Sequence, residues 1–274
     1  MNRDFVRALA GVAAAGLLAA CASSSPARPR HSPVPSPARL SASPASTVQK
    51  APPSLTDTCY STFGVRARPI WFKASDAVRL YGIEAGTGGT AVVLAHEGGT
   101  DLCGWLPYIK TLEKAGIRAF AFDFRGYLNS GAPKDGSLAL GRDLAGAVAQ
   151  VRADGAKHVF LMGASMGGAA VVQNSAGIRV DGLISLSGTR LWPGYGVNDP
   201  AGVHSLSAPF LYIGSRDDWR APRMQALSVF HSVGSNDKHI VLYPGSDHGW
   251  DLVELRPYGP RARATILNWI DRRI

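Results

Sequence analysis

The stretch that decides the fold is HVFLM (158–162) followed directly by GASMGG (163–168). An apolar run of strand length enters a turn of small residues, and a helical stretch follows over 166–175. A strand that reverses abruptly into a helix crowds backbone against backbone, so the turn requires small residues at Gly163 and Gly167. The same strained turn pushes the Ser165 hydroxyl out above the sheet. Ser165 is therefore the candidate nucleophile.

Outward from this turn, short apolar runs alternate with helical stretches. The predicted strands are 69–73, 76–84, 90–95, 117–122, 158–162, 182–186, 210–213 and 240–243. The predicted helices are 106–115, 138–153, 166–175, 223–233 and 261–270. Continuous apolar runs are typical of parallel strands buried on both faces. The order predicts an α/β doubly wound, mostly parallel sheet with helices on both faces, whose active site lies beyond the carboxyl ends of the strands.

A serine hydroxyl needs a base, and the base needs an orienting carboxylate. Of the seven histidines, only His96 and His248 lie just past the end of a predicted strand. We interpret His248 as the base and His96 as a hydrogen-bonding support for its loop. Asp217 and Asp218, which follow the strand 210–213, are the candidate carboxylates.

These motifs, in this order, resemble the α/β-hydrolase family. GASMGG in its strand-turn-helix context is similar to the family's nucleophile elbow, and 214–218 and 245–250 resemble its acid and base loops. The family usually places the acid three residues after a glycine that ends the strand, which implies Asp217; Asp218 replaces it if the turn is one residue longer. DFRGYLNSG (123–131) looks like a structural loop of the family, with Leu128 in place of a glycine.

An acyl-transfer site also needs backbone N–H donors for the developing oxyanion. HEGG (96–99) resembles the family's His-Gly oxyanion loop, which implies Met166 and Gly98 as donors. Glu97 stands where the family commonly has glycine, which leaves the choice between Gly98 and a neighbour open. The His-Glu pair does not extend to H-E-x-x-H, so we expect no zinc, and the resemblance implies no other metal and no cofactor.

Residues 188–208, where the family inserts its lids, are too short and too rich in glycine and proline for a helical cap. We therefore expect no sizeable cap domain. The aromatic residues near the expected rim are Trp192, Tyr195, Trp219 and Trp250.

Residues 1–21 have the features of an export signal. Arg3 and Arg7 precede the apolar stretch 8–20, which is too short to span a bilayer. The small residues before Cys21 resemble a bacterial lipobox, which implies lipidation of Cys21; the alternative is an ordinary secretory signal. Residues 22–56, rich in Pro, Ser and Ala, predict a disordered stalk, and 57–274 the catalytic domain. We expect a protein of the cell envelope, anchored to the membrane by lipid.

The chain has 274 residues, 46% of them hydrophobic, which is enough for a buried core and excludes a disordered or fibrous protein. More than half of the net charge of +9 comes from residues 1–56. The small net positive charge of residues 57–274 argues against a nucleic-acid partner.

With Cys21 lipidated, Cys59 and Cys103 form an even pair in an exported protein and predict a disulfide. The alternative is that each is a small buried hydrophobic residue.

The sequence predicts a serine hydrolase that cleaves small-molecule carboxylic esters through an acyl-enzyme, acting as a monomer. A peptidase, thioesterase or perhydrolase would use the same residues. A non-catalytic binding protein on the same fold is a further alternative, with Glu97 as its supporting feature.

Overall fold

The computed structural model describes residues 59, 63–132, 136, 138–190 and 200–274, all within the unit Lys50–Ile274. The predicted signal (1–21) and stalk (22–56) lie outside the described residues. The strands are β1 (Arg68–Lys73), β2 (Arg79–Ala85), β3 (Thr90–Ala95), β4 (Arg118–Asp123), β5 (His158–Ala164), β6 (Gly182–Leu186), β7 (Phe210–Ser215) and β8 (Lys238–Tyr243). The helices are η1 (Leu102–Trp105), α2 (Leu106–Lys114), α3 (Leu140–Ala153), α4 (Met166–Asn174), α5 (Pro200–Ser205), α6 (Arg223–Ser232), α7 (Asp251–Glu254) and α8 (Gly259–Asp271).

The described strands form one sheet in the order β1-β2-β4-β3-β5-β6-β7-β8. β1 and β2 are antiparallel, and β2 is also antiparallel to β4. From β4 to β8 all neighbouring strands are parallel. The carboxyl ends of β3, β5, β7 and β8 therefore lie along one edge of the sheet, where each of the predicted site loops begins.

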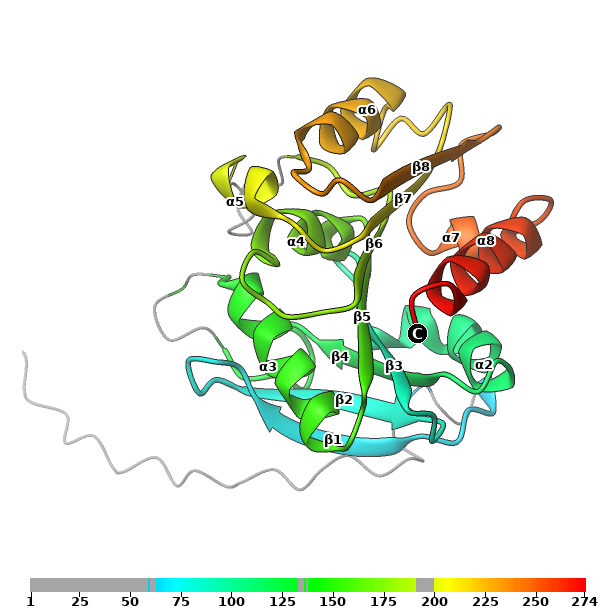
Figure 1. Ribbon diagram of the computed structural model, residues 1–274. Helices are drawn as coiled ribbons and strands as arrows, with labels where there is room; N and C mark the ends of the chain where they lie inside the picture. The colour runs from blue at the N-terminus through cyan, green and yellow to red at the C-terminus, as the bar shows by residue number, and fades with distance from the viewer. Residues whose placement is uncertain (1–58, 60–62, 133–135, 137, 191–199) are drawn as a thin grey trace, which may run out of the picture. The chain divides into compact units, whose positions relative to one another are not determined.

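Helices cover both faces of this sheet (Figure 1). On one face, α3, α4, α5 and α6 pack on strand residues such as Val93 and Leu161. On the other face, η1, α2, α7 and α8 pack on the alternate residues, such as Val92 and Met162. The continuous apolar runs are thus explained by burial on both sides, which confirms the predicted α/β class with a mostly parallel sheet.

The helices contact the sheet through apolar residues at helical spacing. In α8, Ala262, Ile266, Trp269 and Ile270 are buried, and a proline occupies the first turn, where its missing N–H costs no helical hydrogen bond. The predicted helices match α2, α3, α4, α6 and α8 to within a few residues. The sequence prediction missed η1, α5 and α7, which have four to six residues each.

The described residues contain no sizeable cap between β6 and β7, as expected. The short helix α5 is the element found there; residues 191–199 of this segment, with Trp192 and Tyr195, lie outside the described residues. None of the described helices combines the length and apolar character that crossing a bilayer requires.

Replacing Gly146 in α3 by alanine is expected to destabilise the fold. Alanine normally favours a helix by about 1 kcal/mol over glycine. A Cβ at Gly146 would however lie 2.4 Å from Lys73 O and 2.7 Å from Ala74 Cα, so α3 would be forced away from β1. Such overpacking costs roughly 1–3 kcal/mol, and urea unfolding should show a net loss.

Ala149→Gly, on the exposed side of the same helix, is the control for helix propensity alone and should cost about 1 kcal/mol. A Gly146→Ala variant more stable than wild type would contradict this close packing of α3 on β1.

Candidate active site

Ser165 lies in a strained turn between β5 and α4. Its backbone has φ 51° and ψ −112°, in a region that non-glycine residues rarely adopt. A Cβ at Gly163 would lie 2.2 Å from Gly167 O, and a Cβ at Gly167 would lie 2.3 Å from Ala95 O. The predicted crowding of backbone on backbone is therefore present, and it explains the two glycines that flank Ser165.

The structure brings Ser165 and His248 together, although 83 residues separate them. His248 Nε2 lies 2.8 Å from Ser165 Oγ, and His248 Nδ1 lies 2.7 Å from Asp218 Oδ2. All three residues are buried, with 2–4% of their surface exposed. In the neutral tautomer protonated at Nδ1, His248 donates to Asp218 and accepts from the Ser165 hydroxyl. This arrangement can remove a proton from Ser165 and stabilise the resulting imidazolium.

The carboxylate beside His248 is Asp218, so the choice of Asp217 from sequence was wrong. The family pattern would end this strand at Gly214, whereas β7 continues to Ser215. Its pairing continues further still, because Arg216 N–H donates to Tyr243 O and Asp217 N–H donates to Gly245 O. The turn therefore starts later, and Asp217 is left exposed.

Asp218 is held in place from two sides. Its Oδ1 accepts hydrogen bonds from the N–H groups of Arg220 and Ala221, at 2.9 and 3.1 Å. Burial alone would raise the pKa of the Asp218 carboxyl, but the hydrogen bond and charge of His248 and the N–H of Ala221 together hold the pKa below its usual range. Asp218 is therefore ionised at neutral pH, as an orienting carboxylate must be.

His96 supports the loop after β3, as predicted. Its Nε2 accepts from Phe124 N–H at 3.1 Å, and its Nδ1 donates to Glu97 O at 2.7 Å. Burial lowers the pKa of His96 to about 4, so the ring is neutral at pH 7. It thus joins the loops after β3 and β4 and is not a second base for Ser165.

The two predicted oxyanion donors follow two neighbouring strands, Met166 after β5 and Gly98 after β3. Met166 is the first residue of α4, so its N–H has no partner within the helix. Gly98 is half-buried in the loop after β3. The carbonyl of Glu97 faces His96 Nδ1 and Thr100 Oγ1, so the N–H of Gly98, in the same trans peptide, points the opposite way.

Comparison with protein families gives a match over residues 92–270 to the model described as the alpha/beta hydrolase family. The chain belongs to this family. A search of curated proteins gave no match.

Solved structures of the same fold include several hydrolases. An esterase of Pyrococcus furiosus is 14% identical, with a TM-score of 0.67 over 78% of this chain and 93% of that one. A monoacylglycerol lipase of Paleococcus ferrophilus is 18% identical, with a TM-score of 0.61 over 71% of this chain and 99% of that one. A bromoperoxidase of Bacillus anthracis is 15% identical, with a TM-score of 0.62 over 74% and 100%. At these identities the likeness is one of fold.

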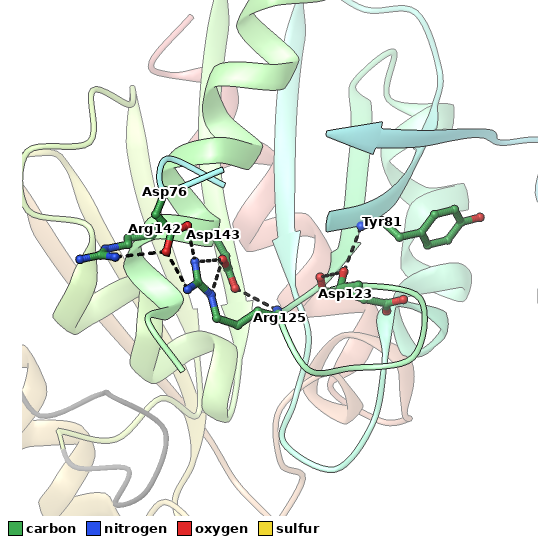
Figure 2. A network of polar contacts seen from close by, with 7 residues as sticks. Asp76, Tyr81, Asp123, Arg125, Arg142 and Asp143 are labelled. Atoms are coloured by element: carbon green, nitrogen blue, oxygen red, sulfur yellow. Dashed lines mark hydrogen bonds and ion pairs between the residues drawn. The ribbon is translucent and has the colours of Figure 1, made fainter. Parts of the chain in front are cut away.

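The alpha/beta hydrolase loop 123–131 is structural here (Figure 2). Arg125, 1% exposed, makes a bidentate pair with Asp76 at 2.9 Å and binds Asp143 through its backbone N–H and its guanidinium. The Arg125 guanidinium holds the pKa of Asp76 well below its usual range. Leu128, where the family has glycine, has φ 31° and is 71% exposed.

The loop also touches the site. Tyr127 packs its ring 4.6 Å from that of His96, and its hydroxyl lies 3.4 Å from Met166 Sδ. Asp123 at the end of β4 accepts from Leu102 N–H at 3.0 Å, and burial raises the pKa of its carboxyl to about 7. The Arg125 cluster therefore fixes a loop that contacts both His96 and the start of α4.

Cys59 and Cys103 are joined by a disulfide in the structure, with their Cα atoms 6.0 Å apart. Asp101 lies beside them, and its Oδ1 accepts from Cys103 N–H at 2.7 Å. These three side chains are also the one group of potential metal ligands in the described part of the chain. With both thiols bonded to each other, the group has no thiolate to offer a metal.

The rim residues within the described part of the chain differ in exposure. Trp219, next to Asp218, is 75% exposed, whereas Trp250 is half-buried and packs against Trp105.

A groove of about 880 Å³ lies between α3 and the loop before β6, at the amino end of that strand. None of the residues that line it belongs to the Ser165 site.

Asp218→Asn is expected to slow the reaction of Ser165 with a fluorophosphonate by about 10⁴-fold, because an amide neither fixes the tautomer of His248 nor stabilises its imidazolium. Asp217→Asn is the matched control and should react at nearly the wild-type rate, since Asp217 is exposed. Mass spectrometry of the labelled peptide measures both rates. The reverse ranking would return the acid to Asp217.

Proposed function

We propose that this protein is a serine hydrolase that cleaves carboxylic esters through an acyl-enzyme. The observation that carries the proposal is the buried chain of hydrogen bonds from Ser165 through His248 to Asp218 at the carboxyl edge of a hydrolase sheet. Ser165 is the nucleophile, His248 the general base and acid, and Asp218 the orienting carboxylate.

In the acylation step, Ser165 Oγ attacks the ester carbonyl carbon while its proton passes to His248 Nε2. Asp218, ionised because of its hydrogen bonds, stabilises the imidazolium and keeps the ring in orientation. The carbonyl electron pair moves onto oxygen, and the resulting oxyanion is stabilised by N–H groups, for which Met166 and Gly98 are our candidates. The intermediate then collapses, and His248 protonates the departing alcohol.

Deacylation uses the same groups with water in place of the alcohol. Water gives a proton to His248 Nε2 as it attacks the acyl carbon. The second intermediate releases the carboxylic acid, and His248 returns the proton to Ser165 Oγ. Each turnover thus consumes one ester and one water and regenerates the free serine, with no step that requires a metal or a cofactor.

Small ester substrates suit the described surroundings of Ser165. Trp219, next to Asp218 in the chain, is 75% exposed and offers aromatic surface to an acyl or aromatic group. Two neighbours of the same fold are named as an esterase and a monoacylglycerol lipase, which supports ester hydrolysis as a class. Peptidase, thioesterase and perhydrolase activities would use the same three residues.

We further propose that the protein acts outside the cytoplasm. The Arg3 and Arg7 region, the apolar stretch 8–20 and Cys21 support export as a lipoprotein. Residues 22–56, at about 3.1 Å per residue when extended, would hold the domain up to roughly 100 Å from its lipid anchor.

Ser165→Ala is expected to abolish the hydrolysis of p-nitrophenyl esters, with kcat reduced by about 10⁶-fold, since the triad acts as a unit. A panel of increasing acyl length, assayed with wild type and variant in parallel, gives both the activity and its chain preference. Equal hydrolysis by both proteins would refute the assignment of the nucleophile. A wild type without activity on any ester, thioester or peptide would favour the non-catalytic alternative.

Radiolabelled palmitate should be incorporated into the wild-type chain in bacterial cells and not into Cys21→Ser, because Cys21 is the proposed lipidation site. Cys59→Ser is a control that removes a thiol elsewhere. Incorporation into Cys21→Ser at the wild-type level would contradict the proposed anchor.

A further inference from the structure

Glu97 makes a hydrogen bond to the backbone of the His248 loop. Its Oε1 accepts from the N–H of Trp250 at 2.8 Å, across a sequence separation of 153 residues. Trp250 comes two residues after His248 and precedes α7. The residue that departs from the family's oxyanion motif is therefore bound to the loop that carries the proposed base.

Gly249, between His248 and Trp250, leaves room for this carboxylate because it has no side chain. Its φ is 58°, in the left-handed region, and a Cβ at this position would lie 1.7 Å from Glu97 Oε1. Any side chain here would therefore displace Glu97 or the loop. The close approach needs both the carboxylate on one loop and the glycine on the other.

The Trp250 side chain is fixed from the opposite side. A Cβ at Gly104 would lie 2.1 Å from the Trp250 ring, so the indole rests directly on that backbone. The ring also meets Trp105 edge-on at 6.0 Å. Since Cys103 of the same turn is bonded to Cys59, the indole packs on a covalently restrained segment. Glu97 therefore holds the backbone of a residue whose side chain is already fixed.

The charges around Glu97 also relate it to His248. Burial raises the pKa of the Glu97 carboxyl above its usual range, and the charge of Asp251 adds to the rise. The N–H of Trp250 and the charges of His248 and Arg220 oppose it. His248, Asp251 and Arg220 are thus the charged groups that face it. The contact that links Glu97 to the His248 loop is therefore the hydrogen bond from Trp250 N–H, which a protonated carboxyl can accept as well as an ionised one.

We propose that Glu97 is a positioning residue for His248, holding the His248–Trp250 backbone so that Nε2 lies within hydrogen-bond distance of Ser165. This inference rests on the proposed serine hydrolase. It also assigns a use to the one residue that departs from the family's oxyanion loop and that would otherwise favour a non-catalytic protein.

The test compares Glu97→Ala with Glu97→Gln in the full chain. Glu97→Ala loses the acceptor for Trp250 N–H, so kcat should fall roughly 10- to 100-fold with KM little changed. Glu97→Gln keeps a carbonyl acceptor and should recover most of kcat.

Gly249→Ala supplies the second arm of the experiment. Its methyl group would displace Glu97 and should lower kcat in the wild-type background. The same change should cost less in the Glu97→Ala background, where no carboxylate occupies that space. Thermal unfolding of all variants shows which of them are folded at the assay temperature.

Wild-type kcat in Glu97→Ala, a Gln variant as slow as the Ala variant, or strict additivity of the Glu97 and Gly249 changes would each overturn the proposal. The rate of fluorophosphonate labelling of Ser165 is measured in parallel, because it reports on His248 without a substrate. If no ester is turned over but labelling slows in Glu97→Ala and recovers in Glu97→Gln, the positioning role stands and the proposed substrate class fails. Absence of labelling in wild type would refute both.

Discussion

The turn from β5 into α4 leaves no room for a Cβ at several positions, and the site depends on this contact of backbone with backbone. Gly163 meets the backbone of Gly167, and Gly167 meets that of Ala95 and His96 at the end of β3. The N–H of Gly167 donates to His96 O, and the N–H of Ser165 donates to Leu186 O at the end of β6. The elbow is thus hydrogen-bonded to the ends of the strands on both sides, which holds Ser165 in its strained conformation.

Buried polar contacts extend this rigidity to the surrounding loops. Arg125 ties the loop after β4 to Asp76, beyond β1, and to Asp143 in α3 (Figure 2). His96 then links that loop to the one after β3 through Phe124 N–H and Glu97 O. A buried guanidinium is costly unless its donors are satisfied. In Arg125, Nε and both terminal nitrogens donate to the carboxylates of Asp76 and Asp143. The Arg125 cluster therefore fixes the loop after β4, and through His96 it also restrains the loop after β3.

The sequence was most informative where a single local rule determines the structure. Apolar runs placed the strands from β3 to β8, and the crowded turn identified Ser165, because both depend on residues that are neighbours in the chain. Contacts between distant segments carry no such local signal. Asp217 was preferred to Asp218 because the family spacing could not show that the pairing of β7 with β8 continues beyond the strand end, through the N–H groups of Arg216 and Asp217. Distinguishing adjacent aspartates requires the register of a neighbouring strand.

The same reasoning explains why the contact between Glu97 and Trp250 could not be foreseen. β3 and β8 are separated in the sheet by β5, β6 and β7. With strands about 4.8 Å apart, their ends lie roughly 19 Å from each other. The two loops meet because both extend inward over the ends of the intervening strands.

Ser165 and Asp218, at the ends of β5 and β7, lie between those loops in the order of the sheet, and both are buried. Family patterns describe each loop separately. Two of these loops are joined by a hydrogen bond, because a carboxylate in place of a glycine after β3 supplies an acceptor for Trp250 N–H.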